Sequence, residues 1–207
     1  MKVIVFGGTG TIGRLVVEQA LAQDHEVTLL TRNRALVGSP DPRVHVVEGD
    51  VFDARAIAPV IAGHDAVVVT LGGGRKGGVR ARGTAAIVEA MRTTGVRRLV
   101  VQSTIGVGDS RAQLNFFWKR LMFGLLLRGA YADHVEQERL TRASGLDWTI
   151  ARPGSFTDGP RTGSYRRGFG PQEKTTLKVS RADVAEFVVE QLTDETWLRQ
   201  SPSLAYA

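Results

Sequence analysis

The chain has 207 residues, of which 43% are apolar, 23% are charged and 7% are aromatic. At roughly 100–200 residues per domain, this length predicts a single domain that covers residues 1–207. The sequence contains no cysteine, which excludes a disulfide scaffold, a zinc ribbon, a cysteine nucleophile and a dithiol redox enzyme. The formal net charge of +6 favours anionic partners such as nucleotide phosphates, but a solvated basic surface explains it equally well.

The apolar stretches are too short for targeting or membrane-spanning segments. The first residues form a brief apolar run that ends in glycines, unlike a signal peptide. The longest apolar stretch elsewhere, Leu114–Leu127, is interrupted by Lys119 and Arg120 and falls short of the ~20 residues that span a bilayer. We therefore expect a cytoplasmic protein without a transmembrane segment.

Short apolar runs rich in Val, Ile and Leu alternate with stretches of helical period along the chain. The predicted strands are Val3–Phe6, Glu26–Thr31, Val44–Glu48, Ala66–Leu71, Arg98–Ser103 and Trp148–Ala151. The predicted helices are Gly13–Gln23, Ala54–Ala62, Thr84–Thr94, Ala132–Ser144 and Ala182–Leu192. Nearly continuous apolar strands that alternate with helices predict an α/β fold, a single doubly wound parallel sheet (Rossmann fold) with helices on both faces.

Three irregular segments follow the fourth, fifth and sixth predicted strands, at 72–83, 105–130 and 153–179. In a doubly wound sheet, ligands bind beyond the carboxyl ends of the strands, where the strand order reverses. We expect these segments to line the pocket, with 105–130 and 153–179 on the substrate side.

The first strand runs directly into the sequence GGTGTIG, and a helix follows at once. Gly7 permits a tight turn, Gly10 lets backbone N–H groups approach a pyrophosphate, and Gly13 lets the helix pack closely on the sheet. This strand, turn and helix context predicts a dinucleotide site. Its predicted residues are Gly7, Thr9, Gly10, Thr11, Ile12 and Gly13.

The residues after the second strand indicate which dinucleotide binds. An NAD site would place Asp or Glu there to bond the ribose hydroxyls, but this sequence has Arg32-Asn33-Arg34. A planar guanidinium suits a 2′-phosphate. We therefore predict NADP(H) in preference to NAD(H), with Arg32 and Arg34 at the phosphate. The alternative is that both arginines are solvated.

Further cofactor candidates follow the third and fourth strands. Asp50 is placed either to accept from the adenine amino group or to cap the next helix, and Val51 is placed to pack on the adenine ring. Leu71, Gly72 and Gly73 allow the backbone to approach ribose and pyrophosphate, with a merely flexible loop as the alternative.

These motifs together resemble the atypical short-chain dehydrogenase/reductases of the NmrA-like group, with the closest resemblance to its biliverdin-IXβ reductase, or flavin reductase, family. The resemblance covers essentially the whole chain. The glycine loop is common to a large superfamily, whereas the Asp133-His134 pair and the stretch Thr162-Gly163-Ser164-Tyr165 are more specific.

Ordinary members of the superfamily use a Tyr-x-x-x-Lys pair, in which the lysine lowers the pKa of the tyrosine for proton exchange. No lysine lies four positions beyond Tyr131 or Tyr165, and Tyr206 is at the end of the sequence. This argues against a carbonyl reductase or a sugar-nucleotide epimerase. The resemblance implies instead that hydride passes directly from the nicotinamide to a stacked acceptor, with protons from solvent.

The candidate catalytic residues are Ser103 and His134. Ser103, followed by Thr104, ends the fifth strand and is placed to bond the nicotinamide ribose or the acceptor; a strand-end cap is the alternative. His134 at the start of the following helix is placed for substrate binding or a proton relay, with helix capping as the alternative. Pro153 follows the sixth strand, where related proteins cover the nicotinamide. The histidine spacing predicts no metal.

We therefore expect an NADPH-dependent oxidoreductase that acts on a small planar acceptor: a flavin, a tetrapyrrole or a quinone. A flavin would be a substrate rather than a bound cofactor. The alternative is a non-enzymatic NADP(H)-binding redox sensor of the NmrA type. Nucleic acid is not expected, because the arginines are scattered and the aromatic residues are few.

The roles of two basic regions have more than one interpretation, and the first of these regions also differs from the family. Residues 114–128 are more apolar and basic than the resemblance implies. Three hypotheses fit them: a lid over an aromatic substrate, a homodimer interface or a membrane-surface helix. Phe156 is placed either to form the bottom of the acceptor pocket or to pack within its own loop. Arg161, Arg166 and Arg167 either reach an acidic acceptor or form a solvated face.

Overall fold

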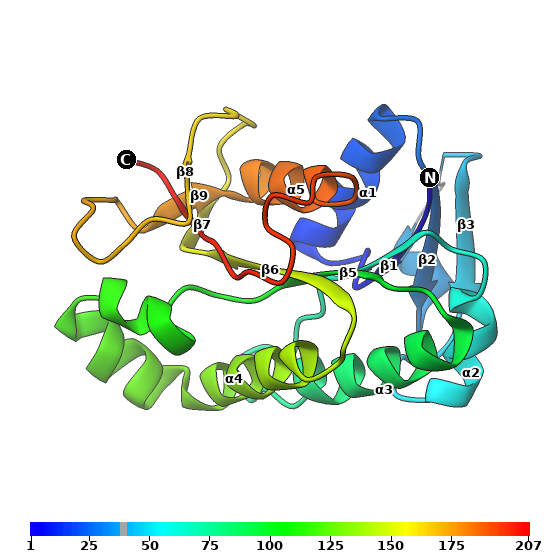
Figure 1. The fold of residues 1–207 in the computed structure, drawn as a ribbon, viewed down its shortest axis with the longest axis horizontal. Helices are drawn as coiled ribbons and strands as arrows, with labels where there is room; N and C mark the ends of the chain where they lie inside the picture. Colours follow the sequence, from blue (N-terminus) through cyan, green and yellow to red (C-terminus); the bar gives the residue numbers. More distant parts are fainter. Residues whose placement is uncertain (38–40) are drawn as a thin grey trace.

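A central, mostly parallel sheet carries helices on both faces (Figure 1) in the computed structural model, which describes residues 1–37 and 41–207. Every pairing in the main sheet is parallel except that of its last two strands. The order across the sheet is β3 (Val44–Glu48), β2 (Glu26–Thr31), β1 (Lys2–Phe6), β4 (Ala66–Val69), β5 (Arg98–Gln102), β6 (Asp147–Pro153), β10 (Ser203–Ala205) and β8 (Arg166–Arg167). The predicted doubly wound Rossmann fold is confirmed.

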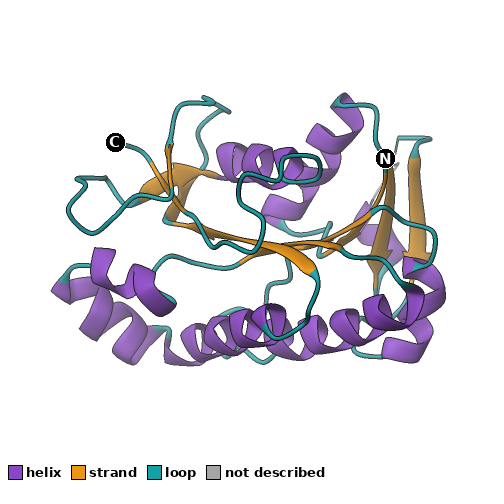
Figure 2. Ribbon diagram, viewed as in Figure 1, coloured by secondary structure: helices purple, strands orange, loops and turns teal. Residues whose placement is uncertain are grey.

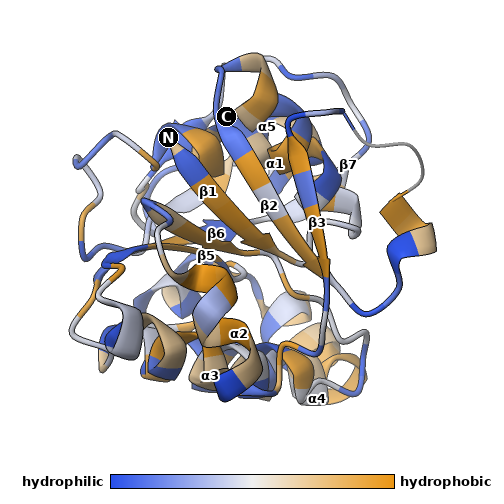
Figure 3. Ribbon diagram, turned by 90° about the vertical axis from the view of Figure 1, so that its right-hand side faces the viewer, coloured by the Kyte–Doolittle hydropathy of each residue, from blue (hydrophilic) through white to orange (hydrophobic). Residues whose placement is uncertain are grey.

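The helices form one layer on each side of the sheet (Figure 2). Helices α1 (Thr11–Ala22) and α5 (Arg181–Glu190) cover one face, and α2 (Ala54–Ile61), α3 (Val79–Thr94) and α4 (Arg128–Arg142) cover the other (Figure 1). Val3 and Val5 of β1 pack into the core below α1 and α5, whereas Ile4 and Phe6 pack into the opposite core. This alternation follows from the two-residue period of a strand, and the central strands are apolar over most of their length (Figure 3).

The strand order reverses beside β1. The chain runs from β1 outward to β2 and β3, and then returns to place β4 on the other side of β1. Phe6, at the carboxyl end of β1, pairs with Leu30 of β2 and with Val69 of β4. The loops that leave these ends diverge, which opens the crevice where doubly wound sheets bind ligands.

Several element boundaries differ from the predicted ones. Helix α3 begins at Val79 rather than Thr84, because the Asp133 carboxylate accepts hydrogen bonds from the Arg80 and Ala81 N–H groups at 3.1 and 2.9 Å. Strand β6 extends to Pro153 rather than Ala151 because β10, an unpredicted strand, pairs alongside it. Both extensions depend on contacts between segments that are distant in sequence.

The irregular segments contain short elements that the sequence analysis did not predict. Strands β7 (Ser155–Thr157) and β9 (Lys178–Ser180) form a separate parallel pair, and a two- or three-residue strand is too short to show a period. The 3₁₀ helices are η1 (Arg34–Val37) and η2 (Gly108–Gln113), and η3 (Trp118–Leu126) is a π-helix. Among the described residues, no helix has the length and apolar character needed to cross a bilayer.

The Thr162–Tyr165 stretch is held at the start of α5. The Ser180 hydroxyl accepts from the Asp183 N–H at 2.9 Å and caps this helix. The fully buried Asp183 carboxylate accepts from the Thr162 and Gly163 N–H groups and from the Tyr206 hydroxyl. Burial acts to raise the pKa of Asp183, but these hydrogen bonds bring it below its usual value. The carboxylate therefore ties this loop and the C-terminal strand to α5.

Candidate functional site

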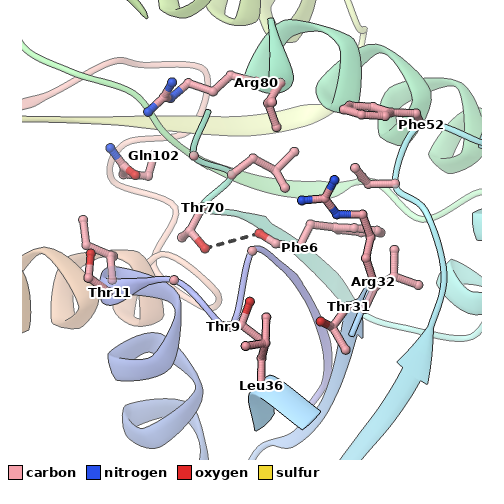
Figure 4. A pocket seen from close by; sticks show the side chains of 18 of the residues that line it. Phe6, Thr9, Thr11, Thr31, Arg32, Leu36, Phe52, Thr70, Arg80 and Gln102 are labelled. Carbon is pink, nitrogen blue, oxygen red and sulfur yellow. Dashed lines mark hydrogen bonds between the residues drawn. The ribbon is translucent and has the colours of Figure 1, made fainter. Parts of the chain in front are cut away.

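A cleft of about 650 Å³ lies at the carboxyl ends of β1, β2, β4 and β5 (Figure 4). The glycine loop after β1 forms part of its wall, and the first turn of α3 forms another part. The predicted site residues that line it are Gly7, Thr9, Gly10, Thr11, Ile12, Arg32, Val51, Leu71, Gly72, Ser103, Thr104 and His134. Residues from six separate stretches of the sequence therefore meet in one cavity.

The glycine loop has space for backbone alone. Gly7 has a φ of +91°, and a Cβ atom on it would lie 2.6 Å from the Thr70 carbonyl oxygen. A Cβ atom on Gly13 would lie 2.2 Å from the Gly7 carbonyl oxygen. Helix α1 then begins at Thr11 with neither a side-chain cap nor an acidic residue in its first turn. Its N-terminal N–H groups and positive dipole end therefore suit an anion such as a pyrophosphate.

The two arginines after β2 differ in position. Arg32 is exposed and points into the cleft (Figure 4), and it has no hydrogen bond or ion pair with any residue that the structure describes. Arg34 does not line the cleft, because its side chain turns along β3 and donates to the Val46 carbonyl oxygen at 3.1 Å. Of this predicted pair, Arg32 is the one placed to meet a phosphate.

The remaining predicted cofactor residues lie outside the cleft lining. Gly13 is buried against the glycine loop, as predicted for close helix packing, and Gly73 lies against the Val79 side chain. Asp50 is exposed and accepts from the Phe52 N–H at 3.0 Å, while Asp53 caps α2 in its place. Pro153 is buried within β6, where its carbonyl oxygen accepts from the Ile105 N–H. Their predicted cofactor contacts stay predictions.

Ser103 belongs to a buried charged network. Its hydroxyl donates to Glu138 Oε1 at 2.8 Å. The Arg152 guanidinium binds both oxygens of the same carboxylate, at 2.9 Å from Nε and 2.7 Å from Nη2. Ser103, Glu138 and Arg152 are 0%, 2% and 1% exposed. Because the single Ser103 proton is directed to the carboxylate, the hydroxyl oxygen is left to accept a hydrogen bond from the cleft.

Sequence reasoning missed this network. Burial acts to lower the pKa of Arg152, but hydrogen bonds and charge from Glu138 and Asp109 raise it above its usual value. The guanidinium therefore stays charged inside the protein. The one signal in the sequence is an arginine at the end of an apolar strand, since a buried Arg needs a buried acid. Nothing local identifies Glu138, in the middle of α4, as that acid.

His134 lies beside Ser103, with its Nδ1 3.5 Å from the Ser103 hydroxyl oxygen. It does not begin its helix as predicted, because α4 starts earlier, at Arg128. Its neighbour Asp133 caps α3 instead. Burial and the positive charge of Arg80 lower the pKa of His134 to about 3. The imidazole is therefore uncharged at neutral pH, where it can form hydrogen bonds but cannot act as an imidazolium acid.

This pKa gives a prediction for stability. In the unfolded chain, His134 takes up a proton at the ordinary histidine pKa of about 6.5. In the folded protein its pKa is about 3, so it stays unprotonated at higher pH. The folded state therefore loses stability as pH falls below about 6.5, by about 2 kcal/mol at about pH 5. His134→Gln should remove this loss in urea denaturation near pH 5 and pH 7.5. His45→Gln, at an exposed position of β3, is the control. The same change in the free energy of unfolding between the two pH values for wild type and His134→Gln would contradict the prediction.

Arg80 is a cleft residue that the sequence analysis did not identify. It lies in the first turn of α3, opposite the Arg32 end of the cleft and near Gln102 (Figure 4). Its Nη1 is 3.6 Å from the Asp133 carboxylate, and its buried Nε and Nη1 have no hydrogen-bond partner among the described residues. The sequence pattern predicts that this helix begins at Thr84, after Arg80, and therefore does not indicate Arg80 as a site residue. The cleft therefore carries one cation toward each end.

The tyrosines lie elsewhere. None of the three, all in the described part of the chain, lines the cleft. The Tyr131 hydroxyl donates to the Gly106 carbonyl oxygen at 2.9 Å, and the Tyr206 hydroxyl donates to Asp183 at 2.6 Å. Burial raises the pKa of Tyr165 well above its usual value. The site therefore has no tyrosine placed to exchange a proton with a ligand.

The two predicted substrate-side segments contribute little to the cleft. Phe156 is the single residue of segment 153–179 that lines the cleft, and no residue of segment 105–130 lines it. The three arginines considered for an acidic acceptor pair with glutamates outside the cleft: Arg161 with Glu186 at 3.6 Å, Arg166 with Glu173 at 2.8 Å and Arg167 with Glu190 at 2.6 Å. These ion pairs lie on the surface, in keeping with the alternative of a solvated face, and contact with an acidic acceptor stays a prediction.

The sheet order, the glycine loop and the cleft at the strand ends together define an NAD(P)-binding Rossmann protein of the oxidoreductase type. The chain matches the NAD(P)H-binding family over residues 7–195, and it belongs to that family.

Known proteins of similar sequence and structure agree with this assignment. The chain is 32% identical to UPF0659 protein YMR090W of Saccharomyces cerevisiae, over 93% of this chain and 87% of the yeast protein. It is similar to ChuY of Escherichia coli O157:H7, described as an anaerobillin reductase, with a TM-score of 0.82, 25% identity and coverage of 99% and 97%. A short-chain dehydrogenase/reductase of Veillonella parvula in complex with NADP has the same fold, with a TM-score of 0.79, 21% identity and coverage of 99% and 94%. The predicted resemblance to atypical short-chain dehydrogenase/reductases is confirmed.

Proposed function

We propose that residues 1–207 form one NAD(P)H-binding domain that reduces a small planar acceptor, with NADP(H) preferred over NAD(H). The acceptor is a flavin, a tetrapyrrole or a quinone, and a flavin would be a substrate rather than a bound cofactor. The observation that carries the proposal is the arrangement of the cleft. The glycine loop, Arg32, which has no partner among the described residues, and the buried Ser103 all line one cavity, as a dinucleotide site requires.

The donors of the cleft fit NADP(H). The loop from Gly7 to Ile12 presents backbone N–H groups and a helix N-terminus with no competing acid, which suits the pyrophosphate. Arg32 would hold the 2′-phosphate, and Val51 would pack on the adenine. Ser103 and Thr104 would face the nicotinamide ribose, because the Ser103 oxygen, whose proton is directed to Glu138, could accept from a ribose hydroxyl.

When bound, NADPH supplies the hydride, and the acceptor takes its second hydrogen from water as a proton. The protein then has to orient the acceptor against the nicotinamide and to exclude water from the space between them. Phe156 offers an apolar surface at the cleft, and Arg80 offers a positive charge. His134, uncharged at neutral pH, would act as a hydrogen-bonding group and not as the proton donor.

Two observations favour a planar acceptor over a carbonyl substrate. No tyrosine is among the described residues that line the cleft, so the usual acid for alcohol and carbonyl chemistry is missing there. The similar protein ChuY is described as a reductase of anaerobillin. A conjugated ring system can accept hydride without a protein acid at the reacting atom, since its charge is delocalised.

The test is oxidation of NADPH by the purified protein, followed by loss of the nicotinamide absorbance with FMN, riboflavin, biliverdin or menadione as acceptor. We expect turnover with at least one of these acceptors and slower turnover with NADH. Tight NADPH binding without oxidation in the presence of any of them would overturn the proposal. That outcome would favour the non-enzymatic redox sensor.

Arg80 gives a more specific expectation. If its guanidinium faces an acidic group of the acceptor, Arg80→Met should raise the KM for FMN about tenfold, since a charged hydrogen bond contributes about 1.5–3 kcal/mol. Riboflavin lacks the phosphate and is the matched control, for which KM should change less than about threefold. Equal effects on FMN and riboflavin would contradict a contact with the acidic group.

A further inference from the structure

The chain carries an apolar, basic surface away from the cleft. Five of the nine exposed large apolar side chains of the described chain fall within eleven residues: Phe116, Phe117, Leu121, Leu125 and Leu126. Phe116 is 77% exposed and Leu125 is 69% exposed. Side chains of this size are usually buried, so their concentration in one segment indicates a contact surface. We call residues 114–128 the apolar segment.

The apolar segment is fixed to the body of the protein. Leu114 and Phe123 are buried in a cluster with Ile105 and Phe169. The Phe123 ring stacks on Tyr131 at 5.0 Å, and Trp118 packs against Phe123 at 5.7 Å. In Figure 1 the π-helix η3 lies at the end of the molecule opposite β3. The inward side chains thus hold the segment in place, and the exposed ones face solvent at one end of the fold.

The charge of this region has one sign. Between Asp109 and Asp133 the sequence contains no acidic residue and four cations: Arg111, Lys119, Arg120 and Arg128. Interfacial helices that bind membranes combine aromatic and leucine side chains with Lys and Arg in this way. The apolar side chains enter the lipid, and the cations meet the negative headgroups of the surface.

We propose that the apolar segment is a binding surface for anionic lipid bilayers, on which the protein docks peripherally. Charge favours this partner over a second copy of the chain. A two-fold contact through the same segment would oppose its three cations, Lys119, Arg120 and Arg128, to the same three cations, and the segment contributes no acid to neutralise them. A lid is also disfavoured, because no residue of the segment lines the cleft. The proposal is independent of the reductase activity.

Co-sedimentation with phosphatidylcholine vesicles, with and without phosphatidylserine, tests the proposal. We expect binding that increases at least tenfold when phosphatidylserine is included and that weakens with added salt. Lys119→Glu with Arg120→Glu should remove this preference, because each basic residue near an anionic leaflet contributes roughly fivefold. Phe116→Ser with Leu125→Ser should reduce binding at least tenfold on both kinds of vesicle.

Val135→Ser is the matched control, since Val135 is an exposed apolar residue of α4 outside the segment. Its binding should equal that of the wild type, and NADPH binding should stay unchanged in all the variants, which shows that they are folded. No binding to vesicles with phosphatidylserine would overturn the proposal. A wild-type dimer that Phe116→Ser with Leu125→Ser dissociates, without lipid binding, would assign the surface to a second copy instead.

Discussion

Arg32→Ala should abolish most of the preference for NADPH, raising its Kd about 30- to 100-fold while changing that of NADH less than about threefold. The guanidinium reaches into the cleft without a partner among the described residues, so a phosphate gains its full charge-assisted interaction. A contact of this kind contributes about 2–3 kcal/mol, and each 1.4 kcal/mol is tenfold in affinity. Titration calorimetry with the two cofactors measures the effect without any acceptor.

Arg34→Ala is the matched control for this prediction. It removes the same charge two residues away, but the Arg34 side chain donates to the Val46 carbonyl oxygen and lies outside the cleft. We expect less than about a threefold change in the Kd of NADPH, because the charge is exposed and screened. A loss equal to that of Arg32→Ala would point to general attraction by the basic surface, and would contradict a direct contact with the 2′-phosphate.

These two arginines also illustrate what sequence alone can predict. The position just after the second strand is defined by the fold, so the absence of an acid there and the presence of arginines could be interpreted directly. Which arginine faces the cleft depends on the turn into η1, where the chain direction changes. The two-residue period that gives side-chain direction in a strand ends with β2. The sequence therefore could not show which of the two arginine side chains faces the cleft.

The long elements were predictable and the short ones were not. Strands such as β1 and β5 are buried apolar runs, and their identity depends on local sequence. The first turn of α3, by contrast, is capped by Asp133 from another helix, more than fifty residues away. The cleft residue Arg80 lies in this turn, so the misplaced helix start also hid a site residue. Errors in the site thus followed from tertiary contacts that local patterns do not contain.

Ser103 was likewise predictable from the sequence, but its setting was not. Its place directly after β5, at the edge of the sheet where the cleft lies, is a matter of topology. The acid that receives its proton and the arginine that neutralises that acid come from α4 and β6. Such a network is specified by three-dimensional packing, and its energetic contribution can be measured.

Arg152→Met should lower the free energy of unfolding by about 3–5 kcal/mol, the usual effect of leaving a buried charge without its partner. The substitution retains much of the side-chain volume but removes both hydrogen bonds to the Glu138 carboxylate, which is 2% exposed. Urea denaturation at neutral pH measures the loss. Adding Glu138→Gln should restore part of the stability, because the neutral amide needs no cation.

The Glu138 carboxylate offers its own control. Arg142 also pairs with it, at 3.2 Å, but the Arg142 side chain is 43% exposed. Arg142→Met should therefore cost less than about 1 kcal/mol, as an exposed ion pair does. If Arg142→Met and Arg152→Met were equally destabilising, burial would not be what makes the Arg152 pair important. The double variant separates charge from volume: if Arg152→Met with Glu138→Gln is no more stable than Arg152→Met alone, the loss comes from packing around β6, and the inferred role of the charged network is wrong.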